Sequence, residues 1–524
     1  MNSIARTYGP AMTTGVLLSL GFPRYHLFPL VWLAFMPLLV SVGPGRIARG
    51  CLQFFISGLV FYLLLLQWLL TNYYWTGGWA AWGYLFLCLF MAAYWGLAGA
   101  VWAWVRERTG TALSILSLTF LWAVMEWLQG TLFSGFGWGS LAYSQGRDLP
   151  LLQWASVGGA PLIAAIVVAF NACVAELFAP QKHRLALSAT AATLLIVPHL
   201  AGYWMLADPD YATRPLSVGI IQPNFSLEMK WDDEYTVEMV RNTAAKSRVL
   251  AQREHVDLFV WPESLVMTAI DDPEIEAEIR ALATATQCPL FTGAQRLDPA
   301  TGEWRNSSYL FDSGGNIVDY YDKLHLAPFG EYVPLSQFIP FVQKLVPAIG
   351  DVEPGTDAKV FKTGERVLGP LICFEVLFGD MAARLRAMGA DVLVVITNLS
   401  WFGESTAIPQ ELEIARVRAV ETRLPLIHSA NSGISGVLDA WGRFTPMNRI
   451  FLEGGQLVTI RSEVRPQELV GRRLGGVLPV AAPVQSPVSK GPQMFPWVAA
   501  ALSIAIILYA AWFGRIRKVG VSGR

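Results

Sequence analysis

Long apolar segments joined by short loops constrain this chain more than any other feature. Seven such segments precede residue 205 and an eighth covers Pro496–Phe513, in a sequence that is 53% hydrophobic and only 15% charged. The seven leading segments are Ala11–Gly21, Phe28–Gly43, Cys51–Thr71, Trp79–Val105, Leu113–Leu128, Ser156–Phe178 and Leu185–Trp204. A helix that crosses about 30 Å of hydrocarbon needs roughly 20 apolar residues, a length that most of these segments approach. We therefore expect a membrane α-helical bundle of about eight transmembrane helices.

The first two segments fall short of that length, and Pro23 and Pro29 separate them. Because proline interrupts a helix, they form either a tight pair of helices or a partly re-entrant segment. A cleaved signal peptide with Arg6 as its charged start is a competing interpretation of the first segment. It is the weaker one, since no small-residue cleavage site follows and the next apolar run begins at once.

Basic residues in the short loops predict the orientation, because loops rich in Lys and Arg stay in the cytoplasm. With the N-terminus inside, the basic residues that fall on the same side are Arg46, Arg49, Arg106, Arg108, Lys182, Arg184, Arg515, Arg517, Lys518 and Arg524. The opposite loops contain only Arg24 and Arg147. This pattern places the region from Ala207 to Gln493 outside the cytoplasm, which is the periplasm in a bacterium with two membranes. We therefore expect an N-terminal transmembrane bundle (1–206), an extracytoplasmic domain (207–490) and a C-terminal transmembrane helix with a cytoplasmic tail (491–524).

Short β-rich runs alternate with helical patterns in the external region, which is typical of one α/β domain. The expected strands are Leu216–Gln222, Leu258–Trp261, Leu290–Ala294, Ser307–Asp312, Val367–Cys373, Val392–Thr397 and Ile427–Ala430. The expected helices are Glu234–Arg253, Pro273–Thr286, Gly379–Met388 and Pro409–Arg423. The stretch Gly475–Gln493 is rich in Pro, Gly, Val and Ser, and we expect a linker there that returns the chain to the membrane.

Charge and cysteine content narrow the class of function. A net charge of −1 gives no electrostatic case for binding nucleic acid. The five cysteines form no CxxC pair and the six histidines are scattered, so we expect no metal site and no cofactor. Cys51, Cys88 and Cys173 lie within apolar segments and are expected to pack as small core residues.

Two acidic residues and a lysine lie in stretches that suit chemistry. Trp261-Pro262-Glu263 continues an apolar strand into a carboxylate at its C-terminal end, where active sites of α/β folds tend to lie. A cap on the following segment is an equally weighted interpretation of Glu263. Lys323 and Glu331 lie in a stretch, residues 321–334, dense in aromatic residues, Pro and Gly. Such a stretch can hold charged groups in a fixed, partly desolvated loop.

Cys373 ends an apolar strand and is followed by a helical pattern. A cysteine at such a turn can be exposed and can feel a helix N-terminus, which lowers the pKa of the thiol. For an isolated cysteine, a buried structural role is the commoner interpretation. An unpaired thiol in an oxidising compartment, however, needs a reason, and pairing with Cys288 is not favoured because that residue precedes a strand and also looks buried.

Glu263, Lys323 and Cys373, in this order and with these flanks, resemble the catalytic residues of the carbon–nitrogen hydrolase (nitrilase) superfamily. Seven leading spans and one trailing span resemble the arrangement in bacterial apolipoprotein N-acyltransferases, as do Glu126-Trp127-Leu128 and Ser134-Gly135-Phe136-Gly137-Trp138. The segment Thr397–Gly403, which includes Asn398, matches a further family block. The chain departs from the family pattern at Leu399, where an acidic residue is common, and at Phe374, where Tyr is frequent.

The resemblance implies a nitrilase-like α-β-β-α sandwich and a chemistry. Glu263 would act as general base, Cys373 as nucleophile and Lys323 as oxyanion partner, with Glu331 and Glu375 in support. An acyl chain would pass from a phospholipid, through a thioester, to the N-terminal amine of a diacylated apolipoprotein. The resemblance further implies a monomer in the bacterial inner membrane with its catalytic domain in the periplasm. Residues that would line the acyl entrance are Trp231, Trp401 and Phe402, although core packing or anchoring at the membrane surface explains such aromatic residues equally well.

Two other functions stay open at this point. A membrane amidase or nitrilase-like hydrolase would keep the same three residues and use water as acceptor; the eight spans argue against it. A transporter or receptor would carry polar groups within several spans, whereas Glu126 alone stands out here. A carboxylate in that position usually faces a polar interior.

Overall fold

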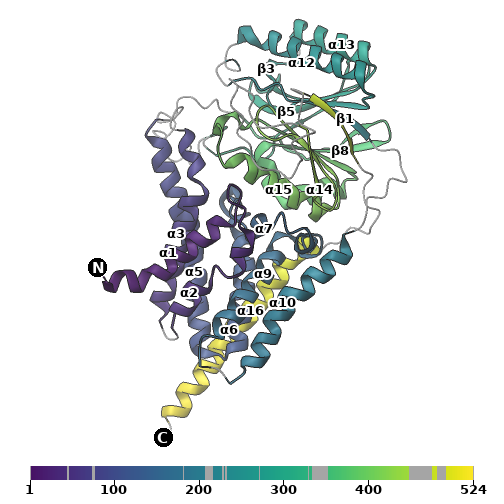
Figure 1. The fold of residues 1–524 in the computed structure, drawn as a ribbon. Coiled ribbons are helices and arrows are strands. Elements are labelled where there is room, and N and C mark those ends of the chain that lie inside the picture. Colours follow the sequence, from purple (N-terminus) through teal and green to yellow (C-terminus); the bar gives the residue numbers. More distant parts are fainter. Residues whose placement is uncertain are drawn as a thin grey trace. The chain divides into compact units, whose positions relative to one another are not determined.

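The described part of the chain forms two compact units. The computed structural model describes residues 2–43, 46–72, 77–180, 182–206, 216–226, 229, 233–270, 272–328, 330–332, 352–447, 475–480 and 491–522. One unit consists of Met1–Leu70, Ala80–Ala207 and Ser489–Arg524, and the other of Thr71–Trp79 and Asp208–Val488. The first is helical, and the second combines helices with two β-sheets (Figure 1).

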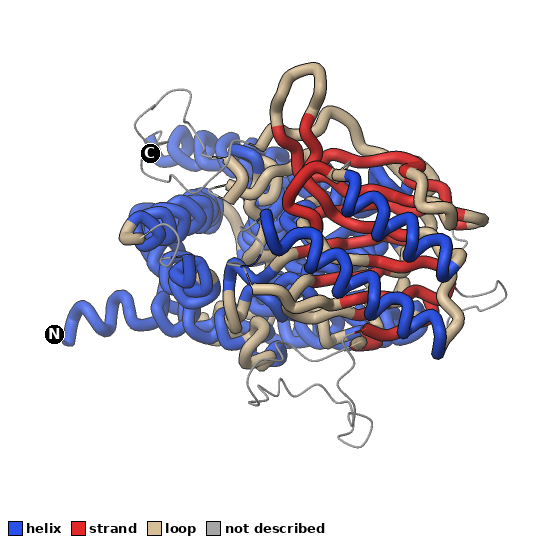
Figure 2. Tube along the Cα trace, turned by 90° about the horizontal axis from the view of Figure 1, so that it is seen from above, coloured by secondary structure: helices blue, strands red, loops and turns tan. Residues whose placement is uncertain are grey.

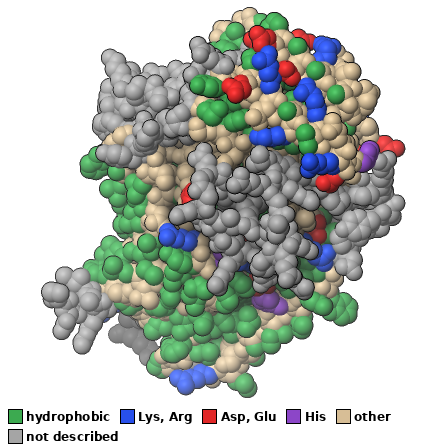
Figure 3. All heavy atoms as spheres, turned by 45° about the horizontal axis from the view of Figure 1, so that its top comes forward, with side chains coloured by type: hydrophobic (Ala, Val, Ile, Leu, Met, Phe, Trp, Pro, Cys, Tyr) green, Lys and Arg blue, Asp and Glu red, His purple; other side chains and the backbone are tan. Residues whose placement is uncertain are grey.

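Six helices of the first unit are long and apolar enough to cross a membrane, by length and composition. They are α3 (Ile47–Leu65), α5 (Trp79–Arg108), α6 (Thr111–Gln129), α9 (Ala155–Glu176), α10 (Arg184–Met205) and α16 (Gly491–Ser522). Each overlaps one of the expected segments. Figure 3 shows hydrophobic side chains over much of the visible helical unit, whereas charged side chains gather over the α/β unit. The expected membrane bundle is therefore confirmed.

The expected count of eight spans is not confirmed. The first expected segment, apart from Gly21, lies in α1 (Asn2–Leu20), which is not apolar enough to belong to the set of six. The second forms a short 3₁₀ turn, η1 (Phe28–Trp32), and a six-residue helix, α2 (Met36–Ser41). A proline stands in the first turn of each, so each helix begins anew and neither reaches the length of a span.

Small side chains hold the centre of the helical unit together. Helix α9 is the most buried of the six candidate spans and contacts α6, α10 and α16. Ala123, Ala165 and Ala499 form a shared cluster of α6, α9 and α16. Because alanine lets helix backbones approach closely, these positions allow tight packing where lipid offers no hydrophobic driving force.

Two β-sheets pack face to face in the second unit. The first has the strand order β13-β1-β2-β4-β5-β6, with β3 paired to β4, and the second has the order β12-β11-β10-β9-β8-β7. The strands of the first are β1 (Leu216–Ile221), β2 (Leu258–Val260), β3 (Val266–Ala269), β4 (Leu290–Leu297), β5 (Trp304–Phe311), β6 (Ile317–Asp322) and β13 (Gly475–Val480). Those of the second are β7 (Phe361–Thr363), β8 (Arg366–Ile372), β9 (Val392–Thr397), β10 (Leu426–Ala430), β11 (Gly436–Leu438) and β12 (Phe444–Pro446). The rings of Phe291 and Phe361 meet between the sheets, 5.7 Å apart.

Helices cover the outer face of each sheet, which gives four layers (Figures 1 and 2). Helices α12 (Asp233–Arg253) and α13 (Pro273–Thr286) pack on the first sheet through residues such as Val240 and Ile279. Helices α14 (Gly379–Ala387) and α15 (Ala407–Thr422) contact the second sheet at β8 and β10. The expected α-β-β-α sandwich is confirmed.

Parallel strands at the centre of each sheet bring their carboxyl ends to one edge. Strands β1, β2 and β4 pair in parallel in the first sheet, and β8, β9 and β10 do so in the second. Glu263, Cys373 and Asn398 follow β2, β8 and β9 along the chain. The topology therefore gathers residues that are far apart in sequence, as parallel sheets commonly do.

The expected linker at Gly475–Gln493 is wrong at both ends. Its first residues form β13, which pairs antiparallel with β1 from Leu216↔Val480 to Ile221↔Gly475. Pro479 is tolerated there because β13 lies at the edge of the sheet, where a missing backbone donor breaks no ladder on the outer side. Helix α16 already begins at Gly491. Residues 481–490 lie outside the described part.

Candidate active site

Glu263 is a buried carboxylate that accepts hydrogen bonds from three directions. The strand before it, β2, is fully buried, and Glu263 itself is 5% exposed. Its Oε1 accepts from Asn306 Nδ2 at 2.9 Å and from Lys323 Nζ at 3.2 Å. Its Oε2 accepts from the backbone N–H of Asn398 at 2.8 Å. These three hydrogen bonds fix the carboxylate between the two sheets.

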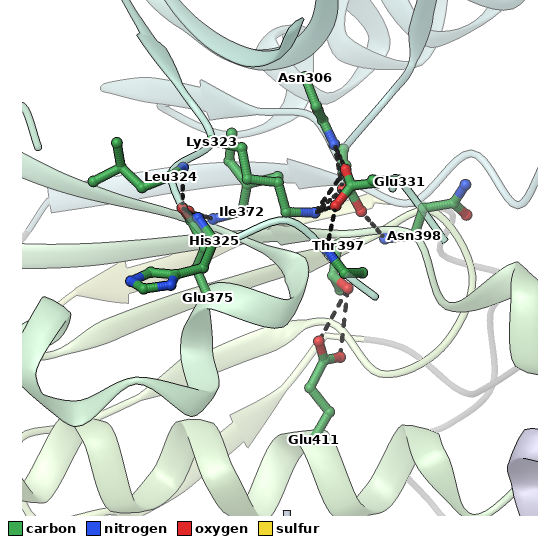
Figure 4. Close-up of polar contacts among 12 residues, drawn as sticks. Asn306, Lys323, Leu324, His325, Glu331, Ile372, Glu375, Thr397, Asn398 and Glu411 are labelled. Carbon is green, nitrogen blue, oxygen red and sulfur yellow. Dashed lines mark hydrogen bonds and ion pairs between the residues drawn. The ribbon is translucent and has the colours of Figure 1, made fainter. Parts of the chain in front are cut away.

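Lys323 is a buried cation held between two carboxylates (Figure 4). It follows β6 directly, and its backbone N–H donates to Asn306 O at 2.8 Å. Its ammonium lies 3.2 Å from Glu263 Oε1 and 2.9 Å from Glu331 Oε2. Burial alone would lower the pKa of Lys323, but the charges of Glu263 and Glu331 outweigh it and hold the pKa well above its ordinary value. Lys323 therefore stays positively charged.

Glu331 is positioned by the turn that precedes it. The backbone N–H of Ala327 donates to Glu331 Oε2 at 2.8 Å, and the backbone N–H of Glu331 donates back to Ala327 O at 2.9 Å. Its Oε1 also accepts from Asn306 Nδ2 at 2.7 Å. The sequence stretch that suggested a fixed, desolvated loop does hold these charges; Phe329, Val333 and Pro334 lie outside the described residues.

Cys373 stands at the sharp turn between β8 and the 3₁₀ helix η5 (Cys373–Leu377), with a φ of +52°. A positive φ is strained for a residue other than glycine, and such strain tends to gather at functional sites. Burial and the negative charge of Glu263 raise the pKa of the Cys373 thiol well above its ordinary value, while the charge of Lys323 opposes them. The expected lowering by a helix N-terminus is therefore wrong, because desolvation outweighs it and α14 begins only at Gly379.

Glu375 ties the cysteine turn to the lysine loop. It is fully buried, and its Oε2 accepts from the backbone N–H of Ile372 at 2.8 Å. Its Oε1 accepts from the backbone N–H of Leu324 at 2.7 Å and from the hydroxyl of Tyr321 at 2.7 Å. Burial raises the pKa of Glu375 to about 7, and these hydrogen bonds oppose the rise. One carboxyl group thus fixes the residues beside both Cys373 and Lys323.

Comparisons with known proteins identify the family to which both parts of the chain are similar. Residues 14–173 match the model of the apolipoprotein N-acyltransferase N-terminal domain, and residues 217–467 match that of carbon-nitrogen hydrolase. The apolipoprotein N-acyltransferase of Geobacter metallireducens is 34% identical over 475 residues, which cover 88% of this chain and 89% of that protein. The one of Gloeobacter violaceus is 32% identical and covers 83% of this chain and 84% of its own length.

This chain belongs to the apolipoprotein N-acyltransferase family. The expected recognition, and the carbon–nitrogen hydrolase domain within it, are thereby confirmed. Among solved structures, Nit3 of Saccharomyces cerevisiae, a member of branch 10 of the nitrilase superfamily, is 19% identical with a TM-score of 0.36 and covers 44% of this chain and 85% of its own.

Of the remaining residues that the family resemblance implies, Asn398 contacts the site, and two of the three aromatic residues lie in the described part of the chain. Asn398 reaches the site through its backbone N–H, while its side-chain Oδ1 accepts from Asn431 Nδ2 at 3.2 Å. Trp401 and Phe402 lie in the 3₁₀ turn η6 (Leu399–Phe402) and are half-buried. Trp231 lies outside the described residues.

Three residues of the site were missed by sequence reasoning. Asn306 on β5 donates from one amide nitrogen to both Glu263 and Glu331, and Thr397 and Glu411 lie close to Cys373. The polar run Asn306-Ser307-Ser308 directly before the apolar residues Tyr309-Leu310-Phe311 of the same strand was the available signal, because polar groups buried in a sheet usually have hydrogen-bond partners. Among the described residues, no group of three His, Cys, Asp or Glu side chains could hold a metal ion.

Glu126 forms a separate polar cluster in the helical unit of the chain. It is 7% exposed and accepts from Trp122 Nε1 at 2.8 Å, from Ser140 Oγ at 2.6 Å and from the backbone N–H of Leu141 at 3.0 Å. The carboxylate joins α6 to the short helix α7 (Leu141–Ser144). The three donors give Glu126 the polar interior that is usual for a carboxylate in such a segment.

Proposed function

We propose that this protein transfers an acyl chain from a membrane phospholipid, through a thioester on Cys373, to the N-terminal amine of a diacylglyceryl-cysteine lipoprotein. The observation that carries the proposal is the convergence of Glu263, Lys323 and the strained Cys373 turn from three strand ends. Membership of the family, whose relatives are named for N-acylation of apolipoproteins, supports the acceptor.

The first half-reaction needs a base, because the raised pKa of Cys373 keeps the thiol protonated at neutral pH. Glu263 takes the thiol proton, and the sulfur attacks the carbonyl carbon of the phospholipid ester. The tetrahedral intermediate collapses as the carbon–oxygen bond breaks. Glu263 returns its proton to the departing oxygen, and a lysophospholipid leaves the thioester behind.

Lys323 supplies the charge that the tetrahedral oxyanion requires. Its ammonium is fixed by two carboxylates and by burial, so it does not have to reorganise when negative charge develops. Hydrogen bonds from Asn306 to Glu263 and Glu331, and from Lys323 to Glu331, hold the ammonium and the Glu263 carboxylate in fixed positions. Backbone N–H groups at the start of η5 would complete the oxyanion site.

The second half-reaction reverses these roles. The free α-amine of the diacylated lipoprotein attacks the thioester carbonyl, and Glu263 accepts a proton from the nitrogen. The carbon–sulfur bond breaks, an amide forms, and Cys373 recovers its proton. Two products leave at separate stages, which defines ping-pong chemistry.

The proposed setting is the bacterial inner membrane, with a monomeric enzyme and its α/β unit on the periplasmic side. Both substrates carry their reactive groups at headgroup level and their chains in lipid, which suits a unit anchored by apolar helices. The positive-inside pattern of the loops supports the orientation. We assign Trp401, Phe402 and Trp231 to the acyl entrance.

Mass spectrometry of the Cys373 peptide tests the proposal. Purified full-length protein is incubated with a phospholipid that carries an isotope-labelled acyl chain, and a thioester of that chain is expected on Cys373. Adding a diacylated lipopeptide should discharge the adduct and yield labelled amide. Cys288, whose buried thiol donates to Val256 O at 2.9 Å, gives the matched control Cys288→Ala, which should still be acylated at Cys373.

Two outcomes would overturn the assignment. Full N-acylation by Cys373→Ala would remove Cys373 as the nucleophile. Discharge of the adduct at the same rate without lipopeptide would make water the acceptor and the protein a membrane hydrolase.

A further inference from the structure

A second buried polar cluster adjoins the cysteine and has no part in the mechanism above. It consists of Thr397 on β9, Glu411 on α15 and His428 on β10, which are 0%, 2% and 1% exposed. Thr397 Oγ1 lies 3.1 Å from Glu411 Oε1, and His428 Nε2 lies 3.6 Å from Glu411 Oε2. Figure 4 shows Glu411 reaching from its helix toward Thr397.

The fold places this cluster beside the proposed nucleophile. Strands β8 and β9 are parallel neighbours, and Ile372 pairs with Ile396. The residues that follow, Cys373 and Thr397, therefore stand side by side at the ends of the two strands. The Thr397 side chain also lowers the pKa of the Cys373 thiol, as a hydroxyl close to the sulfur does.

The hydrogen bond between the His428 ring and a backbone carbonyl fixes the position of one ring hydrogen. Its Nδ1 lies 2.8 Å from Ile434 O, and a carbonyl can only accept, so Nδ1 carries the hydrogen. Its Nε2 has no hydrogen-bond partner among the described residues, and a carboxylate oxygen of Glu411 faces it. If both groups were unprotonated there, two lone pairs would confront each other in a buried site, which is costly. One proton shared between Glu411 and His428 removes the conflict.

Thr397 has a single hydroxyl proton and two possible acceptors. It can donate to Glu411 or to a thiolate on Cys373, but not to both at once. When Thr397 turns to the sulfur, Glu411 loses a hydrogen bond. The proton shared with His428 can then compensate for that loss.

We propose that Glu411 and His428 share one proton and, through Thr397, act as positioning residues that allow the Cys373 thiolate to form. This inference rests on the proposed nucleophilic role of Cys373. In the resting site Thr397 donates to Glu411; once Glu263 has taken the thiol proton, Thr397 donates to the sulfur. The number of protons is unchanged, and only hydrogen bonds are exchanged.

The charges around Cys373 support a need for this neutralisation. After burial, the charge of Glu263 raises the pKa of the thiol most, Lys323 lowers it, and Glu411 raises it further. A proton shared with His428 keeps the Glu411–His428 pair neutral overall. The sulfur then faces one carboxylate charge fewer when it ionises.

The pH profile of Cys373 alkylation tests the network without any lipid substrate. Full-length protein in detergent is treated with iodoacetamide, and alkylation is read from the Cys373 peptide. His428→Gln should move the midpoint up by about one pH unit, because Glu411 then keeps its charge. Glu411→Gln should leave it near the wild-type value, since both partners are then neutral. The double variant His428→Gln/Glu411→Gln should return to the wild-type midpoint.

Variants of Thr397 and two controls complete the experiment. Thr397→Val should slow alkylation at neutral pH and Thr397→Ser should restore it. Thr422→Val and Glu413→Gln alter equally buried groups of α15, in contact with Arg418 O and Arg416, and should leave the profile unchanged.

Equal midpoints for His428→Gln and wild type, or a double variant no different from His428→Gln, would overturn the inference. Acylation by Cys373→Ala would instead refute the proposed function, because the alkylation profile does not depend on substrate.

Discussion

The substitution Lys323→Met tests two contributions of the lysine, one to folding stability and one to catalysis. Lys323 is 1% exposed and lies within 3.2 Å of Glu263 and 2.9 Å of Glu331. Methionine keeps the length of the side chain but leaves two buried carboxylates without their cation. Removing one partner of a buried ion pair costs about 3–5 kcal/mol. In a domain of this size that loss corresponds to a fall in the thermal midpoint on the order of 10 °C.

The double variant Lys323→Met/Glu331→Gln makes the charge argument testable. Removing one carboxylate should recover part of the lost stability, because the remaining Glu263 keeps its hydrogen-bond donors Asn306 and the Asn398 N–H. Activity should not recover, since the oxyanion loses its cation in both variants and turnover falls by roughly 10²–10³-fold. Because the pKa of Lys323 is raised in the folded protein, its contribution to folding stability is complete below the ordinary pKa of 10.5. That contribution is lost only as the pH rises through the higher pKa of the folded state.

The assays are thermal unfolding of the full-length protein in detergent and N-acylation of a diacylated lipopeptide. Lys359→Met is the matched control, because Lys359 pairs with Asp319 at 2.9 Å on the surface, where an ion pair contributes at most about 1 kcal/mol. A double variant no more stable than Lys323→Met would refute the charge-balance reasoning. Lys323→Met with near-normal turnover would refute the role of the lysine in catalysis.

Three further predictions concern single side chains. The pKa of Glu375 is raised from 4.5 to about 7, so the stability that its protonated form contributes is complete below about pH 4.5. This contribution, about 3 kcal/mol, is lost as the pH rises through 7. Glu375→Gln should flatten this part of the curve of thermal midpoint against pH, and an unchanged slope would contradict the prediction. Asn306→Asp places a third carboxylate against Glu263 and Glu331 and should abolish turnover measured with the lipopeptide, whereas activity near wild type would show that the amide bridge is dispensable. Glu126→Ala leaves three buried donors without an acceptor and should lower the thermal midpoint in detergent by the equivalent of about 3 kcal/mol, with Glu126→Gln losing less; equal losses would exclude the hydrogen bonds as the cause.

Much of the architecture followed from local patterns. Apolar length predicted the six candidate spans, and the expected bounds of α13 and β9 agree with the structure to the residue. The predicted linker at Gly475–Gln493 was wrong because its first residues form β13, which is stabilised by pairing with β1, more than 250 residues earlier in the chain. Composition reports local preference and carries no information about such a partner.

The candidate site divides in the same way. Glu263 and Cys373 were predicted from the ends of expected strands, whereas Lys323 was predicted from the aromatic, Pro- and Gly-rich stretch 321–334, because β6 before it was not among the expected strands. Asn306 and Glu411 were missed because their roles depend on hydrogen bonds to residues that are distant in sequence. Asn306 donates to Glu263, and Glu411 accepts from Thr397. The pKa of Cys373 was predicted in the wrong direction, because its sign depends on the balance of burial and neighbouring charges.

The sequence by itself therefore determined that this is a membrane protein with one α/β unit, and it predicted which three residues are candidates for catalysis. Those conclusions depend on hydrophobic length and on short motifs, which are properties of neighbouring residues. Only the tertiary structure decided that Lys323 is buried between two carboxylates, that Glu375 joins two loops, and that Glu411 and His428 lie behind Thr397. Burial and electrostatic interaction depend on distances in space, and parallel sheets bring together residues that the chain keeps far apart.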